Sequence, residues 1–130
     1  MTVADTTFLI DLQKSRRSER HQIAADWIRS NPQESISIPA IVLGEYAEGF
    51  ADPDHPSLRR IRAIHSILPV DELVALQFGS VSRFLRSKGK LIGPNDIWIA
   101  ATALAHEAPL LTRNVAHFTR VPGLRVINYA

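Results

Sequence analysis

The stretch "DIWIAATALAHEAPLLT", residues 96–112, places a helix pattern directly before a strand pattern and decides the fold class. In a helix over about 96–107 the apolar side chains cover nearly every direction, so this helix is expected to be enclosed by the rest of the domain. The run "PLLT" at 109–112 is short and apolar, which is typical of a strand buried on both faces. An enclosed helix followed by a buried strand indicates an α/β fold.

The rest of the chain repeats this alternation of short apolar strands and helices. Further strands are expected at 2–4, 35–38, 66–70 and 124–128. Helices are expected at 7–14, 18–31 with Ser18 as cap, 40–50, 56–66, from 71 onward and, as a single turn, at 114–118. This order predicts a mainly parallel sheet covered on both faces, in one domain over residues 1–130. Ligands bind such sheets beyond the carboxyl ends of the strands, where Asp5 and the residues after Leu111 lie.

The composition limits the chemistry that the protein can perform. A chain of 130 residues with 45% hydrophobic content suits one globular domain. The uncharged run "IWIAATALAH" is too short to cross a membrane core of about 30 Å, and the acidic start does not resemble a secretory signal, so we expect a cytoplasmic protein. There is no cysteine, so a metal would need oxygen ligands or the five histidines.

Basic residues gather in clusters although the formal net charge is only +2. The clusters are "KSRRSER" at 14–20, "RRIR" at 59–62, and Arg83, Arg86, Lys88 and Lys90. They are consistent either with solvated helix faces or with contacts to a polyanion such as RNA. The sequence leaves both interpretations open.

Three acidic residues stand in unusual places. Asp5 directly follows the first strand and serves either as a helix cap or as a carboxylate held at the strand end. Glu45 projects into an apolar stripe, where its charge must be compensated by an arginine or a cation. Asp96 opens the enclosed helix and either caps it together with Asn95 or points toward the interior.

Carboxylates from three separate elements are what a hard divalent cation needs. Mg²⁺ and Mn²⁺ take oxygen ligands in octahedral geometry and retain several waters. Such a site can activate water and stabilise charge on a phosphodiester. We therefore predict that one cation is bound by Asp5, Glu45 and Asp96.

Four motifs carry a resemblance to a known family. They are "VADTTFLIDL" at 3–12, "LGEYAEGF" at 43–50, "GPNDIWIAATAL" at 93–104 and "LLTRNVAHFTRVPGLRVIN" at 110–128. In this order and spacing they resemble PIN-domain ribonucleases, most closely the VapC-type toxins of toxin–antitoxin pairs. The similarity runs over essentially the whole chain.

This resemblance implies both a fold and a function. The fold would be a three-layer α/β/α sandwich around a parallel sheet of four or five strands. The activity would be that of an endoribonuclease that uses Mg²⁺ or Mn²⁺ to cut RNA and leaves a 5′-phosphate and a 3′-hydroxyl. The expected partners are RNA, a VapB-type antitoxin and a second copy of the chain in a homodimer, and the helical hairpin at 39–66, with Tyr46 and Phe50 exposed, is the candidate for partner contacts.

The resemblance also assigns roles to residues. Asp5, Glu45 and Asp96 match the metal-binding carboxylates of the family. Thr7 falls where a polar residue helps to orient the metal or its water, and Thr112 supplies a hydroxyl that can bond to the site. Arg113 either contacts a phosphate or pairs with Glu45 or another carboxylate.

The last motif departs from the family pattern at two positions. Asn114 occupies a position where many relatives have an aspartate, and its carbonyl can still accept a hydrogen bond from water. His117 stands where another acidic residue is frequent, and is interpreted as a surface or capping histidine. A reduced acidic set leaves the number of metals open, and it leaves two alternative functions: a PIN-like module that binds RNA or protein without cutting, and a DNA nuclease or phosphatase on the same scaffold.

Overall fold

Five parallel strands form the centre of the protein in the computed structural model, which describes residues 1–15 and 22–130. The strands are β1 (Thr2–Ala4), β2 (Ile36–Pro39), β3 (Ile67–Leu68), β4 (Leu110–Thr112) and β5 (Val126–Asn128). Their order in the sheet is β3-β2-β1-β4-β5, and every neighbouring pair is parallel. The predicted parallel sheet is confirmed, and it has five strands.

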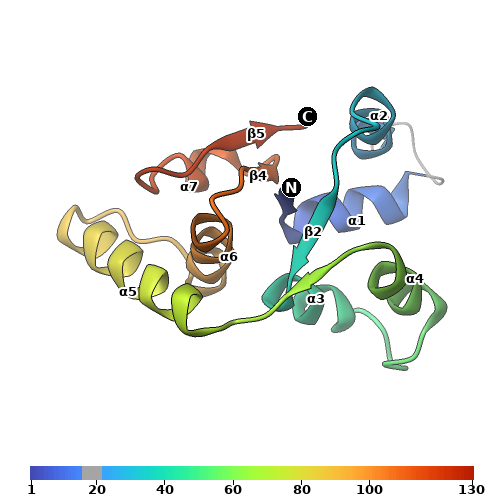
Figure 1. Ribbon diagram of the computed structural model, residues 1–130, viewed down its shortest axis with the longest axis horizontal. Coiled ribbons are helices and arrows are strands. Elements are labelled where there is room, and N and C mark those ends of the chain that lie inside the picture. The colour runs from blue at the N-terminus through green and yellow to red at the C-terminus, as the bar shows by residue number, and fades with distance from the viewer. Residues whose placement is uncertain (16–21) are drawn as a thin grey trace.

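Helices cover this sheet on both sides. They are α1 (Thr6–Lys14), α2 (Gln22–Ser30), α3 (Ala40–Ala47), α4 (Pro56–Ile64), α5 (Glu72–Ser87), α6 (Pro94–Ala105) and α7 (Val115–Phe118). Helices α5 and α6 pack beside each other on the left of Figure 1, and α1, α2 and α4 lie on the right, with β2 between the two groups. The predicted α/β/α sandwich is confirmed.

The enclosed helix predicted near residue 96 is α6, but it begins earlier than expected. Gly93 is its N-cap and Pro94 its first residue, a position where the missing N–H of proline costs nothing. Asp96 therefore lies inside the first turn, and the hypothesis that Asp96 and Asn95 cap the helix is wrong. Six residues of α6 are buried: Ile97, Ile99, Ala100, Ala101, Thr102 and Ala103.

The two tryptophans pack against other rings. Trp27 meets Phe8 edge to face, with ring centroids 6.4 Å apart. Trp98 stacks on Phe78 at 3.9 Å and joins α6 to α5. The predicted cap Ser18 lies outside the described residues.

Other element ends shift by a few residues. Helix α3 ends at Ala47 rather than near residue 50, and α4 ends at Ile64. Within the described ranges, no helix is both long and apolar enough to span a membrane.

Candidate active site

Asp5 stands at the carboxyl end of β1, and both interpretations of its role hold together. Its Oδ1 accepts hydrogen bonds from the backbone N–H of Phe8 at 3.1 Å, which caps α1, and from the hydroxyl of Thr7 at 2.7 Å. Its Oδ2 accepts a short hydrogen bond from the hydroxyl of Thr112, at the end of β4. The residue is only 3% exposed, so this carboxylate is held at the strand end as well as used as a cap.

Burial raises the pKa of Asp5 above its ordinary value. The hydrogen bonds from Thr112, Thr7 and the Phe8 amide oppose this shift, because they favour the ionised form. The negative charge of Asp96 raises the pKa of Asp5 further, although Asp96 lies in α6, far from Asp5 in the sequence. The charge of Asp96 is therefore felt by Asp5 at this edge of the sheet, and added positive charge would offset its effect on Asp5.

Asp96 is half-buried and contacts the short helix α7. Its Oδ2 lies 3.2 Å from Nδ1 of His117. The same ring nitrogen lies 3.0 Å from Nδ2 of Asn114, and the backbone N–H of Asn114 donates to the Thr112 hydroxyl at 2.9 Å. An Nδ1 that carries a proton donates it to the Asp96 carboxylate, whereas an Nδ1 without a proton accepts from the Asn114 amide. The two contacts therefore belong to different tautomers of His117.

His117 thus contacts the candidate site. The sequence interpretation of this residue as a surface or capping histidine did not include that contact. Its side chain is 45% exposed, yet it faces a predicted metal ligand. Asn114 takes the N-cap position of α7, but its side chain makes no cap bond and turns to His117 instead. The one-turn helix therefore presents His117 to Asp96, and the Asn114 side chain contacts His117.

Glu45 comes from α3 and is half-buried. Its Oε1 accepts a hydrogen bond of 2.8 Å from the hydroxyl of Thr6, at the start of α1. No arginine in residues 1–15 and 22–130 forms an ion pair with Glu45. The sequence predicted that an arginine or a cation compensates the charge of Glu45. Among the described residues, Glu45 has no arginine partner and accepts a hydrogen bond from the Thr6 hydroxyl.

Arg113 pairs with a carboxylate, as one of its two interpretations proposed, but the partner is Asp11 rather than Glu45. Its Nε lies 3.3 Å from Oδ2 of Asp11, whose side chain is completely buried in α1. The hydroxyl of Tyr129 donates to the same oxygen at 2.7 Å. Asp11 lies four residues after Thr7 and hence on the same helix face, which was the one local signal that could have identified it.

The predicted metal ligands are brought to one edge of the sheet without forming a ready ligand cluster. Asp5, Glu45 and Asp96 each have a separate local partner: Thr7 and Thr112, Thr6, and His117 respectively. Among the described residues, no three aspartate, glutamate or histidine side chains lie together so that they could hold a metal ion. Joint ligation by these three carboxylates stays a prediction.

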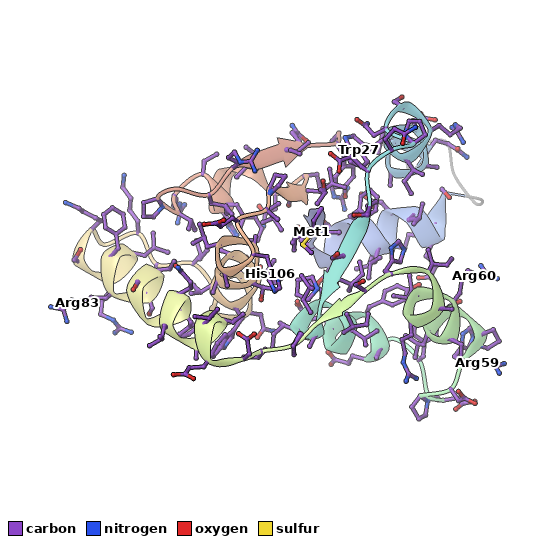
Figure 2. The ribbon with its side chains drawn as sticks, viewed as in Figure 1. Met1, Trp27, Arg59, Arg60, Arg83 and His106 are labelled. Atoms are coloured by element: carbon purple, nitrogen blue, oxygen red, sulfur yellow. The ribbon has the colours of Figure 1, made fainter. Side chains whose placement is uncertain are left out.

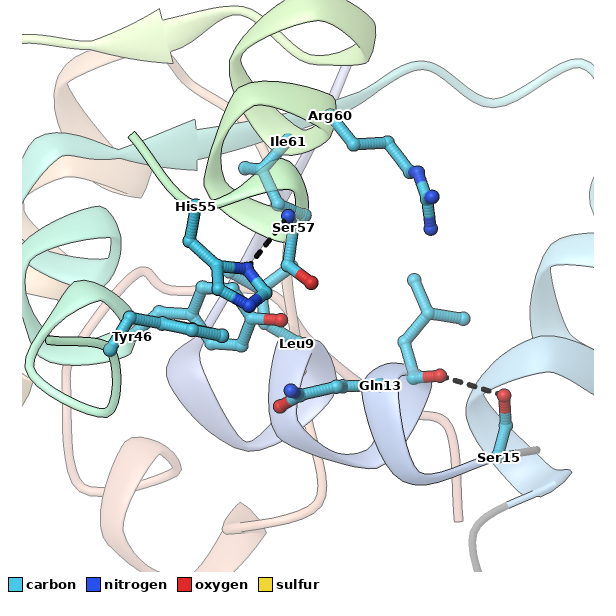
Figure 3. Close-up of a pocket in the computed structure, with 10 residues that line it drawn as sticks. Leu9, Gln13, Ser15, Tyr46, His55, Ser57, Arg60 and Ile61 are labelled. Carbon is cyan, nitrogen blue, oxygen red and sulfur yellow. Dashed lines mark hydrogen bonds between the residues drawn. The ribbon is translucent and has the colours of Figure 1, made fainter. Parts of the chain in front are cut away.

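A separate groove lies between α1, α3 and α4, with a volume of about 630 Å³. Figure 3 shows His55 beside the ring of Tyr46, with Arg60 reaching over the opening and Leu9 and Gln13 rising from α1. Tyr46 is only 7% exposed, so the expectation that it is an exposed contact residue is wrong. Its ring instead forms a wall of the groove and packs edge to face on Phe50, with centroids 5.2 Å apart.

The described basic residues do not form one continuous patch. Arg83, on α5, lies at one end of the long axis in Figure 2, and Arg59 and Arg60, on α4, lie at the other. Most of the third cluster, residues 16–20, lies outside the described residues. Any polyanion that touches both visible groups must span the molecule.

The comparisons with known proteins agree with this geometry. The family model described as the PIN domain matches residues 2–124, and the chain belongs to the PIN-domain family. The resemblance drawn from the four sequence motifs is thereby confirmed.

Named relatives extend over nearly the same length. Ribonuclease VapC1 of Methanocaldococcus jannaschii is 32% identical over 127 residues, which cover 95% of this chain and 85% of the relative. Ribonuclease VapC1 of Haemophilus influenzae is 31% identical over 127 residues, which cover 93% and 92%.

Solved structures show the same arrangement of elements. VapBC-1 from nontypeable Haemophilus influenzae matches with a TM-score of 0.79 and 29% identity, over 98% of this chain and 97% of that one. VapBC2 from Rickettsia felis, bound to a DNA fragment from its promoter, matches with a TM-score of 0.80 over 99% and 98%. At 23% identity the second likeness supports the fold alone.

Proposed function

We propose that this protein is a divalent-cation-dependent endoribonuclease and the toxin of a toxin–antitoxin pair. One observation carries the proposal: the buried carboxylate of Asp5 and the carboxylate of Asp96, from different elements, are linked at the carboxyl edge of the sheet by the chain of polar contacts described above. Active sites are where such like-charged pairs are held together. Membership of the PIN-domain family and the names of the relatives, ribonucleases called VapC, support the same activity.

The donor set at this edge fits a hard divalent cation. Carboxylate, hydroxyl and amide oxygens are its preferred ligands, and a cation would offset the repulsion that contributes to the raised pKa of Asp5. We assign Mg²⁺ or Mn²⁺ to Asp5, Glu45 and Asp96, directly or through water. When bound, the cation supplies an activated water and positive charge beside the scissile phosphodiester. The contacts of Asp96 with His117 and of Glu45 with Thr6 are those that binding would exchange.

The neighbouring polar residues orient the reactants. Thr7 and Thr112 fix both oxygens of Asp5, so this carboxylate presents a constant geometry. His117, which contacts Asp96, and Asn114, which contacts His117, orient the attacking water or the phosphate. In-line attack of water on phosphorus with cleavage of the P–O3′ bond yields a 5′-phosphate, and the O3′ leaving group takes up a proton to become a 3′-hydroxyl.

The groove between α1, α3 and α4 is the proposed contact for an antitoxin. Its apolar lining from Leu9, Tyr46 and Ile61, with Arg60 at the rim, suits an amphipathic helix that carries acidic side chains. The solved relatives are VapBC toxin–antitoxin assemblies, which supports a VapB-type partner here. We also retain the homodimer and a cytoplasmic location as parts of this proposal.

The activity is tested with the purified full chain and labelled single-stranded RNA in Mg²⁺ or Mn²⁺. We expect cleavage by the parent, and losses of at least about 100-fold in Asp5→Ala, Asp96→Asn and Glu45→Gln, because each removes a proposed ligand. Glu48→Gln is the matched control, since Glu48 is an exposed carboxylate at the end of the same helix as Glu45. Parent protein that cuts no RNA with either ion, or ligand variants as active as Glu48→Gln, would contradict the proposal.

A non-cutting binding module is the second candidate function. It is favoured by the separate partners of the three carboxylates and by the neutral side chain at Asn114. RNA binding without cleavage in any divalent cation would support this function. Cleavage of DNA or of a small phosphoester in preference to RNA would instead point to a DNA nuclease or phosphatase.

A further inference from the structure

Asp11 is a buried carboxylate that has no role in the proposed mechanism. It lies beside the acidic site, which is the group of Asp5, Glu45 and Asp96 with their polar partners Thr7, Thr112, Asn114 and His117. Its side chain is 0% exposed, and it lies on the face of α1 that also carries Thr7. Burying a carboxylate is costly, and a buried ion pair contributes little net stability compared with a well-packed apolar pair. Stability alone is therefore a weak reason for a charge at this position.

Tyr129 fixes the carboxylate of Asp11 from the other end of the chain. Its hydroxyl donates to Oδ2 of Asp11 at 2.7 Å, and burial raises the pKa of Tyr129, so the proton stays on the donor. The same hydroxyl oxygen lies 3.4 Å from the Thr7 hydroxyl, which donates to Asp5. The ring of Tyr129 packs edge to face on Phe8 at 5.1 Å, so this donor is itself held in place.

Arg113 is the outward-facing member of this group. It stands between Thr112 and Asn114, which both belong to the acidic site, and its side chain is 45% exposed. Among the described residues, Arg113 forms its ion pair with Asp11 through Nε, which lies 3.3 Å from Oδ2 of Asp11. A guanidinium has five N–H donors in a fixed plane, so the four on its terminal nitrogens can bind two oxygens of a phosphate.

We infer that Asp11 is a positioning residue for RNA cleavage: it aligns Arg113 at the rim of the acidic site to bind a backbone phosphate, and Tyr129 fixes Asp11. The inference rests on the proposed endoribonuclease function. Asp11 itself touches neither RNA nor the cation in this scheme. Its effect must therefore vanish when Arg113 is absent.

A double-mutant cycle tests this dependence. Steady-state cleavage of a labelled single-stranded RNA is measured in Mn²⁺ for the parent, Asp11→Asn, Arg113→Ala and the double variant. We expect Asp11→Asn to raise KM about tenfold with kcat within about threefold, because a lost phosphate contact weakens substrate binding more than chemistry. The double variant should be no worse than Arg113→Ala.

Two further variants separate positioning from folding. Tyr129→Phe keeps the ring and removes the donor, so it should raise KM in the same direction by a smaller factor. Asp26→Asn removes the carboxylate of an exposed ion pair with Arg29 in α2, and should leave both constants unchanged. Melting temperatures are recorded for all variants, and the assays are run well below the lowest of them.

Salt dependence gives a readout that a purely structural role would not change. Metal-free binding of the same RNA is measured against salt concentration, and the slope of log K against log salt should fall by about 0.7 in both Asp11→Asn and Arg113→Ala, which is the loss of one single-strand phosphate contact. An unchanged KM and slope in Asp11→Asn, or additive losses in the double variant, would overturn the inference while cleavage by the parent upholds the proposed function. If the parent cuts no RNA, the proposed function fails, and the binding slopes still decide the role of Asp11.

Discussion

Replacing Thr112 by valine removes one hydroxyl from the acidic site and leaves the side-chain volume nearly unchanged. Thr112 is fully buried at the end of β4. Its hydroxyl donates to Oδ2 of Asp5 and accepts from the backbone N–H of Asn114 at 2.9 Å. The variant therefore deprives a buried carboxylate of a donor and a partly buried amide of an acceptor.

The magnitude follows from these two contacts. A hydrogen bond to a charged group contributes about 1.5–3 kcal/mol, and water can replace part of the amide bond because Asn114 is half-exposed. We expect Thr112→Val to lower the free energy of unfolding by about 2–4 kcal/mol near neutral pH. The pKa of Asp5 rises further, because one of the hydrogen bonds that lower it is lost. The penalty is complete above that raised pKa and shrinks as the pH falls through it, since a protonated carboxyl depends less on a donor.

Urea denaturation in metal-free buffer, near neutral pH and again near the ordinary aspartate pKa, measures both effects. Thr102→Val is the matched control, because Thr102 is equally buried but donates only to the carbonyl of Trp98 at 2.8 Å, inside α6. The control should cost about 0.5–1.5 kcal/mol at either pH. A Thr112→Val penalty no larger than that of Thr102→Val, or one that is independent of pH, would refute the electrostatic reasoning about Asp5.

Three further predictions follow from buried polar groups and from the groove. Thr2→Val should raise the free energy of unfolding by about 1 kcal/mol in urea denaturation, because the fully buried Thr2 hydroxyl has no hydrogen-bond partner among the described residues. In buffer with EDTA and at a pH above the raised pKa of Asp5, Asp5→Asn should have a higher melting temperature than the parent, because a raised pKa means that the ionised carboxylate destabilises the folded state. This advantage should disappear below the ordinary aspartate pKa, where the carboxyl group of the parent is protonated. Phe50→Ser, at the wall of the groove, should weaken inhibition by the antitoxin about tenfold and leave cleavage by the free toxin unchanged.

The fold was largely predictable because its signals are local. Short apolar runs identified β1 and β4, and the all-round apolar pattern identified α6 as enclosed. The position of Asp5 directly after a strand placed it at the carboxyl edge, where the structure has it. Helix ends were less predictable, since the start of α6 depends on the geometry of Gly93 and Pro94 rather than on the hydrophobic pattern.

The partners within the site were not predictable, because they join segments far apart in sequence. Tyr129 meets Asp11 across 118 positions, and no periodicity indicates which distant side chain faces a helix. Arg113 could have served any nearby carboxylate, and only the packing of α1 against the end of β4 selects Asp11. His117 was underestimated for the same reason, since its contact with Asp96 depends on how α7 packs against α6.

The Mn²⁺ dependence of RNA cleavage decides whether the carboxylates at this edge form a metal-dependent ribonuclease site. The rate for a labelled single-stranded RNA is measured across a Mn²⁺ titration for the parent and Asp96→Asn, and the ends of the products are identified. We expect saturable activation of the parent, products with 5′-phosphate ends, and at least about a 100-fold lower rate for Asp96→Asn at every Mn²⁺ concentration. Cleavage that persists in EDTA, or equal rates for the two proteins across the titration, would contradict this expectation.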